Sequence, residues 1–232
     1  MKVKKIGNSR YYEVSELLRN SITSNELIKT FEWYEGISKS YDELYKEEQQ
    51  SKYEVLTQLI KSKDIIHRRE YRILDVGCGT LELLSYLISK NLEPLYYVGL
   101  DLSYSLLTQG RKKFLLSSTV FDIVACDLMY PPLRADFKFH VVTFFSVILC
   151  EYKIDNIVLY YLVSHLFRDG IILFTVVCNN EDLLSELISD IKDILNLDAC
   201  NLIRHNEIIC WKVGVRNEAK KHLNKSGHSC TG

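Results

Sequence analysis

The spacing of hydrophobic and polar residues changes near residue 71, and from there short apolar runs alternate with longer amphipathic stretches. Because strands that alternate with helices form a parallel sheet covered on both faces, this order predicts a doubly wound α/β domain. The expected strands are 72–76, 95–100, 120–125, 140–147 and 170–177, and the expected helices between and after them are 81–91, 103–117, 155–168 and 181–195.

The last two apolar runs, 199–203 and 208–215, are joined by only four residues. A parallel crossover needs about a dozen residues or more, so these runs predict an antiparallel hairpin. We therefore expect a Rossmann-like seven-stranded sheet, mostly parallel, that ends in a C-terminal antiparallel hairpin. In such a sheet the ligand binds beyond the carboxyl ends of the strands, near the point where the strand order reverses.

The N-terminal region differs from the rest of the chain. Helix-like pieces at 14–20 and 24–31 are mixed with aromatic residues and predict a helical extension or cap. Residues 41–61 carry apolar side chains three or four positions apart and predict an amphipathic helix that leads into the domain. We expect three parts, which are the cap at 1–40, the α/β domain at 41–215 and a basic, flexible tail at 216–232.

Composition limits the partners of this chain. Hydrophobic residues make up 47% and charged residues 25% of its 232 residues, which is typical of one folded domain. The formal net charge of −1 gives no overall field for holding a polyanion, so RNA contact would depend on the basic residues near the two ends. No apolar stretch reaches the ~20 residues of a membrane span. We expect a cytoplasmic protein that makes no membrane contact.

The seven cysteines are odd in number and include no Cys-x-x-Cys pair. This pattern indicates neither a disulfide framework nor a zinc site. We therefore expect reduced thiols and no metal ion.

The strongest chemical signal is the sequence Ile-Leu-Asp-Val-Gly-Cys-Gly-Thr at 73–80, where an apolar strand passes through two glycines into a helix. Glycine permits a tight turn and the close approach of a ligand. A dinucleotide fingerprint has glycine or alanine at its sixth position, but here that position is Glu82, and a carboxylate would repel a pyrophosphate. S-adenosylmethionine has no phosphate and carries a sulfonium and an ammonium group, so acidic surroundings favour this methyl donor.

Three further motifs follow in order along the chain. The run Tyr-Val-Gly-Leu-Asp-Leu-Ser ends a strand with Asp101, an acid that can accept hydrogen bonds from both hydroxyls of a ribose. The segment 125–133 carries Asp127 ahead of two adjacent prolines. The segment 139–148 is an apolar strand with two adjacent phenylalanines.

Together with the glycine loop and the Tyr-Asp pair at 41–42, these motifs resemble the class I S-adenosylmethionine-dependent methyltransferase family, in particular its small ubiquinone-biosynthesis-type domains. The resemblance covers about residues 41–177. It implies that the loop at 75–79 wraps the methionine part of the cofactor, that Asp101 binds the ribose, and that Asp127 binds the adenine amino group. The cofactor-binding residues that the resemblance implies are Tyr41, Asp75, Gly77, Cys78, Gly79, Asp101, Leu102, Asp127, Leu128 and Phe144.

Two positions depart from the family pattern. The family usually has a third glycine where this chain has Leu81, and a bulky side chain there would narrow the cofactor loop. His140 stands where the family usually has an aspartate.

The reaction that the resemblance implies is an in-line displacement, in which a substrate nucleophile attacks the sulfonium methyl group and S-adenosylhomocysteine leaves. Because the donor is already activated, alignment supplies much of the catalysis and a general base is optional. No catalytic residue is assigned, and the candidates for a base are Glu47, Tyr130, His140 and Glu151. The acceptor is an unidentified small molecule or protein. The alternatives are a tRNA or rRNA methyltransferase and a non-catalytic partner subunit of the same fold, for which Leu81 is the support.

Overall fold

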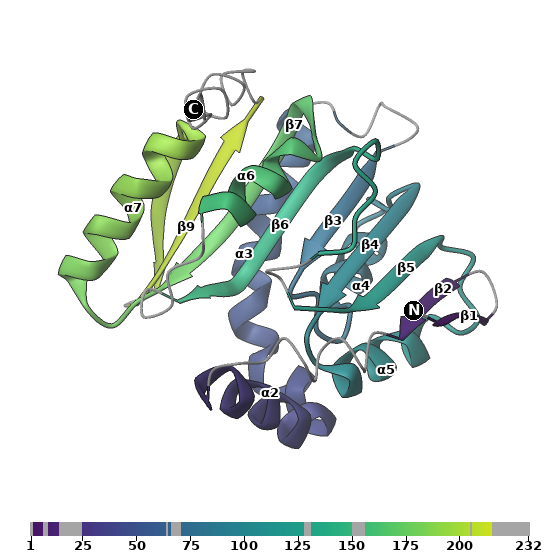
Figure 1. Ribbon diagram of the computed structural model, residues 1–232. Helices are drawn as coiled ribbons and strands as arrows, with labels where there is room; N and C mark the ends of the chain where they lie inside the picture. Colours follow the sequence, from purple (N-terminus) through teal and green to yellow (C-terminus); the bar gives the residue numbers. More distant parts are fainter. Residues whose placement is uncertain are drawn as a thin grey trace, which may run out of the picture.

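The structure is a computed structural model that describes residues 2–6, 9–13, 25–63, 65, 71–127, 131–149, 156–204 and 206–214. Among these residues the strands form one nine-stranded sheet in the order β1-β2-β5-β4-β3-β6-β7-β9-β8 (Figure 1). The strands of its main part are β3 (Arg72–Val76), β4 (Tyr96–Asp101), β5 (Phe121–Ala125), β6 (Phe139–Leu149), β7 (Leu166–Val177), β8 (Ala199–Arg204) and β9 (Glu207–Val213). The helices are α2 (Asn25–Ile37), the short 3-10 helix η1 (Ser38–Ser40), α3 (Tyr41–Ser62), α4 (Glu82–Ser89), α5 (Tyr104–Lys113), α6 (Asn156–Ser164) and α7 (Glu181–Leu195).

The seven strands β3 to β9 confirm the predicted sheet. Strands β3, β4, β5, β6 and β7 are parallel to their neighbours among these five, whereas β9 is antiparallel to both β7 and β8. The chain runs from β3 to β4 and β5 on one side, and then returns to place β6 on the other side of β3. The strand order therefore reverses at β3, and the crevice for a ligand is expected at the carboxyl end of this strand.

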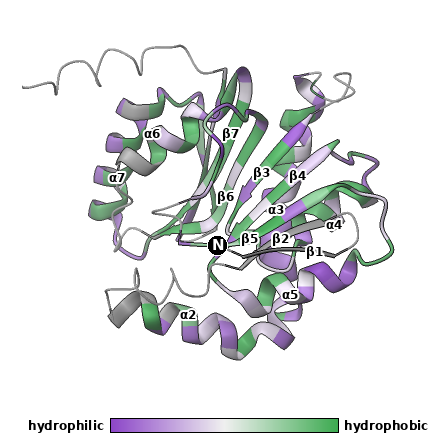
Figure 2. Cartoon of the chain, turned by 45° about the vertical axis from the view of Figure 1, so that its right-hand side comes forward, coloured by the Kyte–Doolittle hydropathy of each residue, from purple (hydrophilic) through white to green (hydrophobic). Residues whose placement is uncertain are grey.

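Helices cover both faces of the sheet. Neighbouring residues of each strand point to opposite sides, so each face forms its own core with the helices that cover it. In β3, Ile73 packs with the face that α3, α4 and α5 cover, and Leu74 packs with the face that α6 and α7 cover. Figure 2 shows strands that are mostly hydrophobic and helices, such as α5, that mix hydrophobic and hydrophilic residues. None of the helices in the described ranges is long and apolar enough to cross a membrane.

The N-terminal region adds a feature that the sequence did not predict. Strands β1 (Lys2–Ile6) and β2 (Ser9–Glu13) form an antiparallel hairpin, and β2 extends the sheet by pairing in parallel with β5. Valine, isoleucine and tyrosine favour strands, and lysine is common on an exposed sheet edge. Residues 25–31 of the helix-like piece expected at 24–31 lie within α2, whereas residue 24 and the piece expected at 14–20 lie outside the described residues.

The helix expected at 155–168 ends earlier, at Ser164 in α6, and β7 begins two residues later. The cause is a turn at His165. The backbone N–H of His165 donates to the carbonyl of Leu162 at 3.0 Å, and Nδ1 of its ring lies 2.8 Å from the carbonyl of Tyr161. These contacts complete the last helical turn, and β7 begins at the next residue, Leu166.

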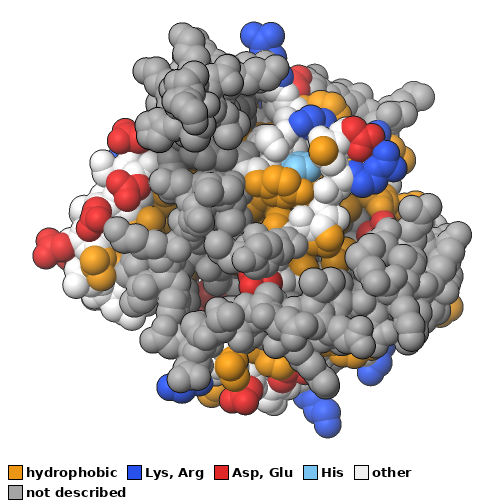
Figure 3. Space-filling view, in the orientation of Figure 1, with side chains coloured by type: hydrophobic (Ala, Val, Ile, Leu, Met, Phe, Trp, Pro, Cys, Tyr) orange, Lys and Arg blue, Asp and Glu red, His pale blue; other side chains and the backbone are white. Residues whose placement is uncertain are grey.

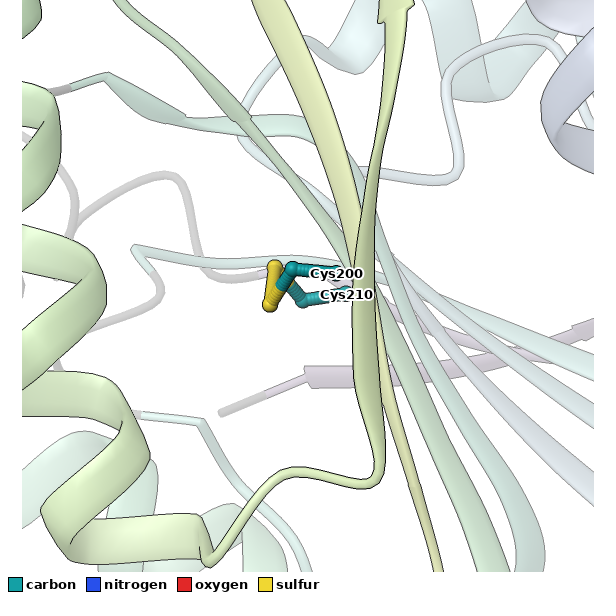
Figure 4. Close-up of a disulfide and its surroundings, with 2 residues drawn as sticks. All are labelled: Cys200 and Cys210. Carbon is teal, nitrogen blue, oxygen red and sulfur yellow. A yellow bond between two sulfur atoms is a disulfide. The ribbon is translucent and has the colours of Figure 1, made fainter.

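Cys200 and Cys210 form a disulfide between the neighbouring strands β8 and β9, which corrects the expectation of reduced thiols for this pair (Figure 4). The two residues are directly opposite each other in the β8–β9 register, with Cα atoms 4.1 Å apart. That register depends on the turn between the strands, so the spacing of cysteines along the chain could not reveal it. Cys78 and Cys126 are buried free thiols.

Candidate functional site

The loop that follows β3 is shaped by its two glycines. Gly77 and Gly79 have φ angles of +76° and +50°, in the left-handed region that favours glycine. A Cβ atom on Gly77 would collide with the side chain of Val147, and one on Gly79 would lie 3.3 Å from the ring of Tyr41. The backbone N–H groups of Gly77 and Cys78 both donate to the carbonyl of Leu100 in β4, at 2.7 and 3.0 Å. The loop is therefore fixed against β4 at the switch point of the sheet.

A cavity of about 270 Å³ opens beside this loop, between α3 and α4. Four of the predicted cofactor-binding residues line it, and aromatic side chains from α3, α4 and the end of β6 form much of its wall. Its lining consists of Tyr41, Asp42, Tyr45, Lys46, Gln49, Gln50, Tyr53, Asp75, Gly77, Cys78, Thr80, Glu82, Leu83, Ser85, Tyr86, Ser89 and Phe145.

Asp75 supplies a buried carboxylate at the inner end of the cavity, with only 3% of the residue exposed. The hydroxyl groups of Tyr97 and Thr143 donate hydrogen bonds to it, the latter at 2.8 Å. Burial raises the pKa of Asp75 to about 6, in spite of the two hydrogen bonds, and the nearby charge of Asp101 adds to the increase. At neutral pH the group is an anion held in a poorly solvated place, which makes it a strong partner for a cation.

Asp101 ends β4 and holds the glycine loop in place. Its two carboxylate oxygens accept hydrogen bonds from the backbone N–H groups of Gly79 and Ser103, each at 2.8 Å. Burial raises its pKa to about 6, against the opposing effect of these bonds. A carboxylate has about four lone-pair positions, and the backbone bonds from Gly79, Ser103 and Leu102 leave one for a hydroxyl donor. Asp101 can thus order the loop and still bind a ribose.

The segment α2–α3 closes over this end of the sheet. The rings of Tyr34 and Tyr41 have centroids 6.0 Å apart, those of Tyr41 and Tyr45 are 4.8 Å apart, and Tyr41 lies against Gly79. Burial is the main cause that raises the pKa of Tyr34 to about 12, and it raises the pKa of Tyr41 further. Tyr41 thus lies over the glycine loop, and Tyr34 is a further aromatic residue packed against Tyr41.

Two acids, Glu35 and Asp42, anchor this segment to the rest of the domain, and neither set of contacts was predicted. Glu35 of α2 accepts hydrogen bonds from the hydroxyl of Ser103 at 2.6 Å and from the backbone N–H of Ser105 at 3.1 Å, where an acid also complements the N-terminus of α5. Asp42 of α3 accepts a hydrogen bond from Thr80 and pairs with Lys113 at 2.6 Å. These partners come from four elements far apart in sequence, so no local pattern marks them.

Leu81 does not obstruct the cavity. It has a φ angle of +63°, which is the conformation that a glycine would adopt at this position, and its side chain is fully buried. The side chain points into the space that two glycines of neighbouring elements leave open, since a Cβ atom on Gly110 would lie 2.8 Å from Cγ of Leu81 and one on Gly99 would lie 3.3 Å from its Cδ2. Leu81 is absent from the cavity wall. The expected narrowing of the loop does not occur.

The other predicted binding residues lie in different surroundings. Phe144 is fully buried in the core between the sheet and α6 and α7, whereas its neighbour Phe145 lines the cavity, because adjacent strand residues face opposite sides. Leu102 is half-buried beside Asp101, and Asp127 is half-buried just after β5. Leu128 lies outside the described residues.

Neither of the two candidates for a general base that lie within the described residues lines the cavity. Glu47 is exposed on α3 and is not part of the cavity wall. His140 lies near the start of β6, where its Nδ1 accepts a hydrogen bond from the backbone N–H of Arg72 at 3.1 Å, so it is at the end of the strand away from the glycine loop. Tyr130 and Glu151 lie outside the described residues.

No protein-family model matches the chain, and no curated protein matches it in sequence. Solved structures match it in fold. Magnesium protoporphyrin IX methyltransferase from Synechocystis, with bound SAM, gives a TM-score of 0.60 at 13% identity over 84% of this chain and 99% of that chain. An S-adenosylmethionine-dependent methyltransferase from Clostridium acetobutylicum gives 0.58 at 14% identity over 78% and 99%, and a DhpI–SAH complex gives 0.58 at 15% identity over 84% and 100%. The chain therefore has the fold of class I S-adenosylmethionine-dependent methyltransferases.

Proposed function

We propose that this chain is an S-adenosylmethionine-dependent methyltransferase that acts on a small molecule or a protein. The observation that carries the proposal is the buried carboxylate of Asp75, which faces a cavity beside the glycine loop at the switch point of this fold. The likeness in fold to structures with bound SAM or SAH supports the same cofactor here.

The residues around the cavity fit this cofactor in charge. Three acids line the cavity, Asp42, Asp75 and Glu82, against Lys46 in the wall and Lys113, which pairs with Asp42 and Glu82. A phosphate-bearing cofactor would meet repulsion there, whereas a sulfonium and an ammonium group meet attraction. The aromatic wall adds to this, because a cation over an aromatic face is stabilised by about 0.5–2 kcal/mol. Lys46 suits the carboxylate of the methionine part.

The proposed binding mode gives each end of the cofactor its own residues. Asp75 would bind the ammonium group and Lys46 the carboxylate, while the backbone of the loop at 75–79 surrounds the methionine part. Asp101 would accept a hydrogen bond from a ribose hydroxyl through its remaining lone pair, and Asp127 lies further along the same edge of the sheet, beyond β5. Tyr41 covers the loop and shields this region from water.

The bound cofactor supplies an activated methyl group, so the chain's own residues have to align the acceptor and exclude water. Orientation of two reactants can contribute roughly 7–11 kcal/mol to lowering a barrier. The closed lid of Tyr34, Tyr41 and Tyr45 provides the exclusion of water. Alignment rather than proton abstraction is the proposed source of catalysis, since Glu47 and His140 stand away from the cavity.

The two alternatives have less support. The outer face of α7 is acidic, as the red side chains at the left edge of Figure 3 show, and the cavity is acidic too, so an RNA backbone would be repelled from both. The exposed acids of α7 are Glu181, Asp182, Glu186, Asp190 and Asp193. The partner-subunit alternative rested on Leu81, which leaves the cavity open.

Calorimetric titration of the purified protein with S-adenosylmethionine and S-adenosylhomocysteine tests the proposal. We expect micromolar binding that weakens at least tenfold in Asp101→Asn and is unchanged in the matched control Glu47→Gln, whose side chain is exposed outside the cavity. Circular dichroism establishes that each variant is folded. Absence of binding by folded wild-type protein would contradict the proposal. If the cofactor binds, transfer of a labelled methyl group to candidate acceptors would identify the substrate.

A further inference from the structure

A buried charged cluster lies behind the cavity and takes no part in the proposed cofactor site. Lys52, in the middle of α3, has no exposed surface and pairs with Glu207 of β9 at 2.7 Å and with Glu48 at 3.2 Å. Its ammonium group also donates to the hydroxyl of Ser146 in β6 at 2.5 Å. A buried ion pair contributes little to stability, because desolvation offsets the attraction. The fold alone does not account for this cluster.

The backbone at Ser146 is strained, which is a second unusual feature of the cluster. Ser146 has a φ angle of +57° and lies where the β6–β7 register shifts, between Phe144 and Ile148. A left-handed conformation costs a non-glycine residue about 1–2 kcal/mol. The bond from the backbone N–H of Ser146 to Oγ1 of Thr175, at 2.8 Å, and the bond from Lys52 hold it there.

Gln49 connects this cluster to the cavity. Its amide nitrogen donates to Oγ of Ser146 at 3.4 Å, and the residue is 92% buried while it lines the cavity. Its carbonyl oxygen Oε1 is buried and has no hydrogen-bond partner among the described residues. A buried acceptor without a partner costs about 1–3 kcal/mol, so a ligand group that donates a hydrogen bond would relieve this cost.

The hydrogen bonds of the cluster determine what such a ligand can be. Lys52 has three protons, and Glu48, Glu207 and Ser146 accept all three. The open position on the cavity side is therefore an acceptor, Oε1 of Gln49. The wall of the cavity carries three acids, Asp42, Asp75 and Glu82, against Lys46 and against Lys113, which pairs with two of these acids, so the wall is negative. It would repel a carboxylate or phosphate and attract an amine.

The strand order places this cluster on the side expected for the methyl acceptor. Asp101 on β4 and Asp127 after β5 lie on one side of β3, where the proposal puts the adenosine. Ser146 on β6 and Glu207 on β9 lie on the other side of β3. Gln49 and Phe145 line the part of the cavity on this second side. The glycine loop thus separates that part from the proposed position of the adenosine.

We propose that this part of the cavity is the acceptor subsite, that Oε1 of Gln49 receives an N–H of the acceptor, and that the acceptor is an amine. This inference rests on the proposed methyltransferase function. An acceptor that carries an ammonium group releases one proton to bulk water before it enters the closed cavity. The neutral nitrogen then uses its lone pair to form the C–N bond as the C–S bond breaks, and the electron pair of the C–S bond goes to sulfur.

Fragment binding to protein saturated with S-adenosylhomocysteine tests the subsite, because the product then fills the cofactor site. The probes are phenethylamine and phenylacetate, which share an aromatic body and differ in charge, and NMR titration measures their dissociation constants. We expect millimolar binding of phenethylamine and at least fivefold weaker binding of phenylacetate. In Gln49→Leu we expect phenethylamine to bind at least fivefold more weakly, with S-adenosylhomocysteine affinity unchanged within twofold.

Gln58→Leu is the matched control, because Gln58 is exposed on the same helix α3 and is not part of the cavity wall. It should leave phenethylamine binding unchanged. Gln49→Met, which is unbranched like glutamine, repeats the test with different packing should the leucine variant misfold. Equal or tighter binding of phenylacetate, unchanged phenethylamine binding in the Gln49 variants, or no phenethylamine binding to the loaded protein would overturn the inference. Failure to bind S-adenosylhomocysteine would instead contradict the proposed function.

Discussion

Replacing Asp75 with asparagine should stabilise the fold and weaken the cofactor site at the same time. Asparagine keeps the shape of the side chain and removes a charge that is buried at the cavity. The hydroxyls of Tyr97 and Thr143, which donate to the carboxylate, can each donate to or accept from an amide. The hydrogen bonds can therefore be kept while the desolvation cost of the anion is removed.

The size of the gain follows from the pKa of Asp75, which burial raises from 3.8 to about 6. This difference corresponds to about 3 kcal/mol, an upper bound because the charge of Asp101 contributes to it. The sign follows from proton binding. Between pH 4 and 6 the folded state holds the proton more tightly than the unfolded state, so the stability of the wild type falls as the pH rises through this window. Above about pH 6 the folded state bears the full free-energy cost of burying the ionised Asp75 carboxylate.

Thermal and urea unfolding of wild type and Asp75→Asn between pH 4 and 7.5 measure the effect. The two proteins should have similar stability at pH 4, and the variant should gain up to about 3 kcal/mol at pH 7.5, or roughly 6–12 °C in Tm for a chain of this size. Its affinity for S-adenosylhomocysteine should fall at least tenfold, because the ammonium group loses its anion. The exposed Asp136→Asn is the control and should change neither quantity. A variant that is less stable at pH 7.5, or a difference that does not depend on pH, would refute the reasoning.

Three further perturbations test other parts of the structure. Leu81→Gly loses a buried side chain but relieves a left-handed backbone. Urea unfolding should therefore show that the free energy of unfolding falls by about 1–3 kcal/mol. Improved binding of S-adenosylhomocysteine would show that Leu81 obstructs the site. Lys113→Ala removes the ion-pair partner of Asp42 and should speed hydrogen exchange at residues 38–46. Global stability should change little, since partly exposed ion pairs contribute about 0–1 kcal/mol. Unchanged exchange would show that the Lys113–Asp42 pair does not hold α3 in place. Cys200→Ser, which removes the Cys200–Cys210 disulfide and its 10-residue loop, should lower the free energy of unfolding by about 2–3 kcal/mol under oxidising conditions, measured by urea unfolding.

The sequence predicted the main sheet because its information is local. Alternating strand and helix patterns predict parallel strands, and a four-residue link between the last two runs leaves room only for a hairpin. The glycine loop and Asp75 were predictable for the same reason, since strand, turn and helix follow one another directly. The β1–β2 hairpin was not predicted, because its five-residue strands carry too weak a pattern and depend on pairing with β5.

The parts of the site that the sequence missed depend on contacts between distant segments. Phe144 and Phe145 are adjacent, and which of them faces the cavity depends on the sheet register. The direction of the Leu81 side chain depends on space left by glycines in β4 and α5. Lys52 lies 94 residues from Ser146, so no spacing along the chain marks their contact.

Two unfavourable features line the cavity and a third contacts it through Gln49, which argues for a site shaped by its ligands. They are the buried charge of Asp75, the left-handed backbone of Ser146 and the buried Oε1 of Gln49, which lacks a partner among the described residues. Each costs about 1–3 kcal/mol, a large fraction of the 5–15 kcal/mol by which a domain is typically stable. A ligand at one hundred times its dissociation constant returns about 2.7 kcal/mol to the folded state. An ammonium group at Asp75 and an N–H donor at Gln49 would offset two of these costs directly, so the pattern of local instability and the proposed pair of ligands support each other.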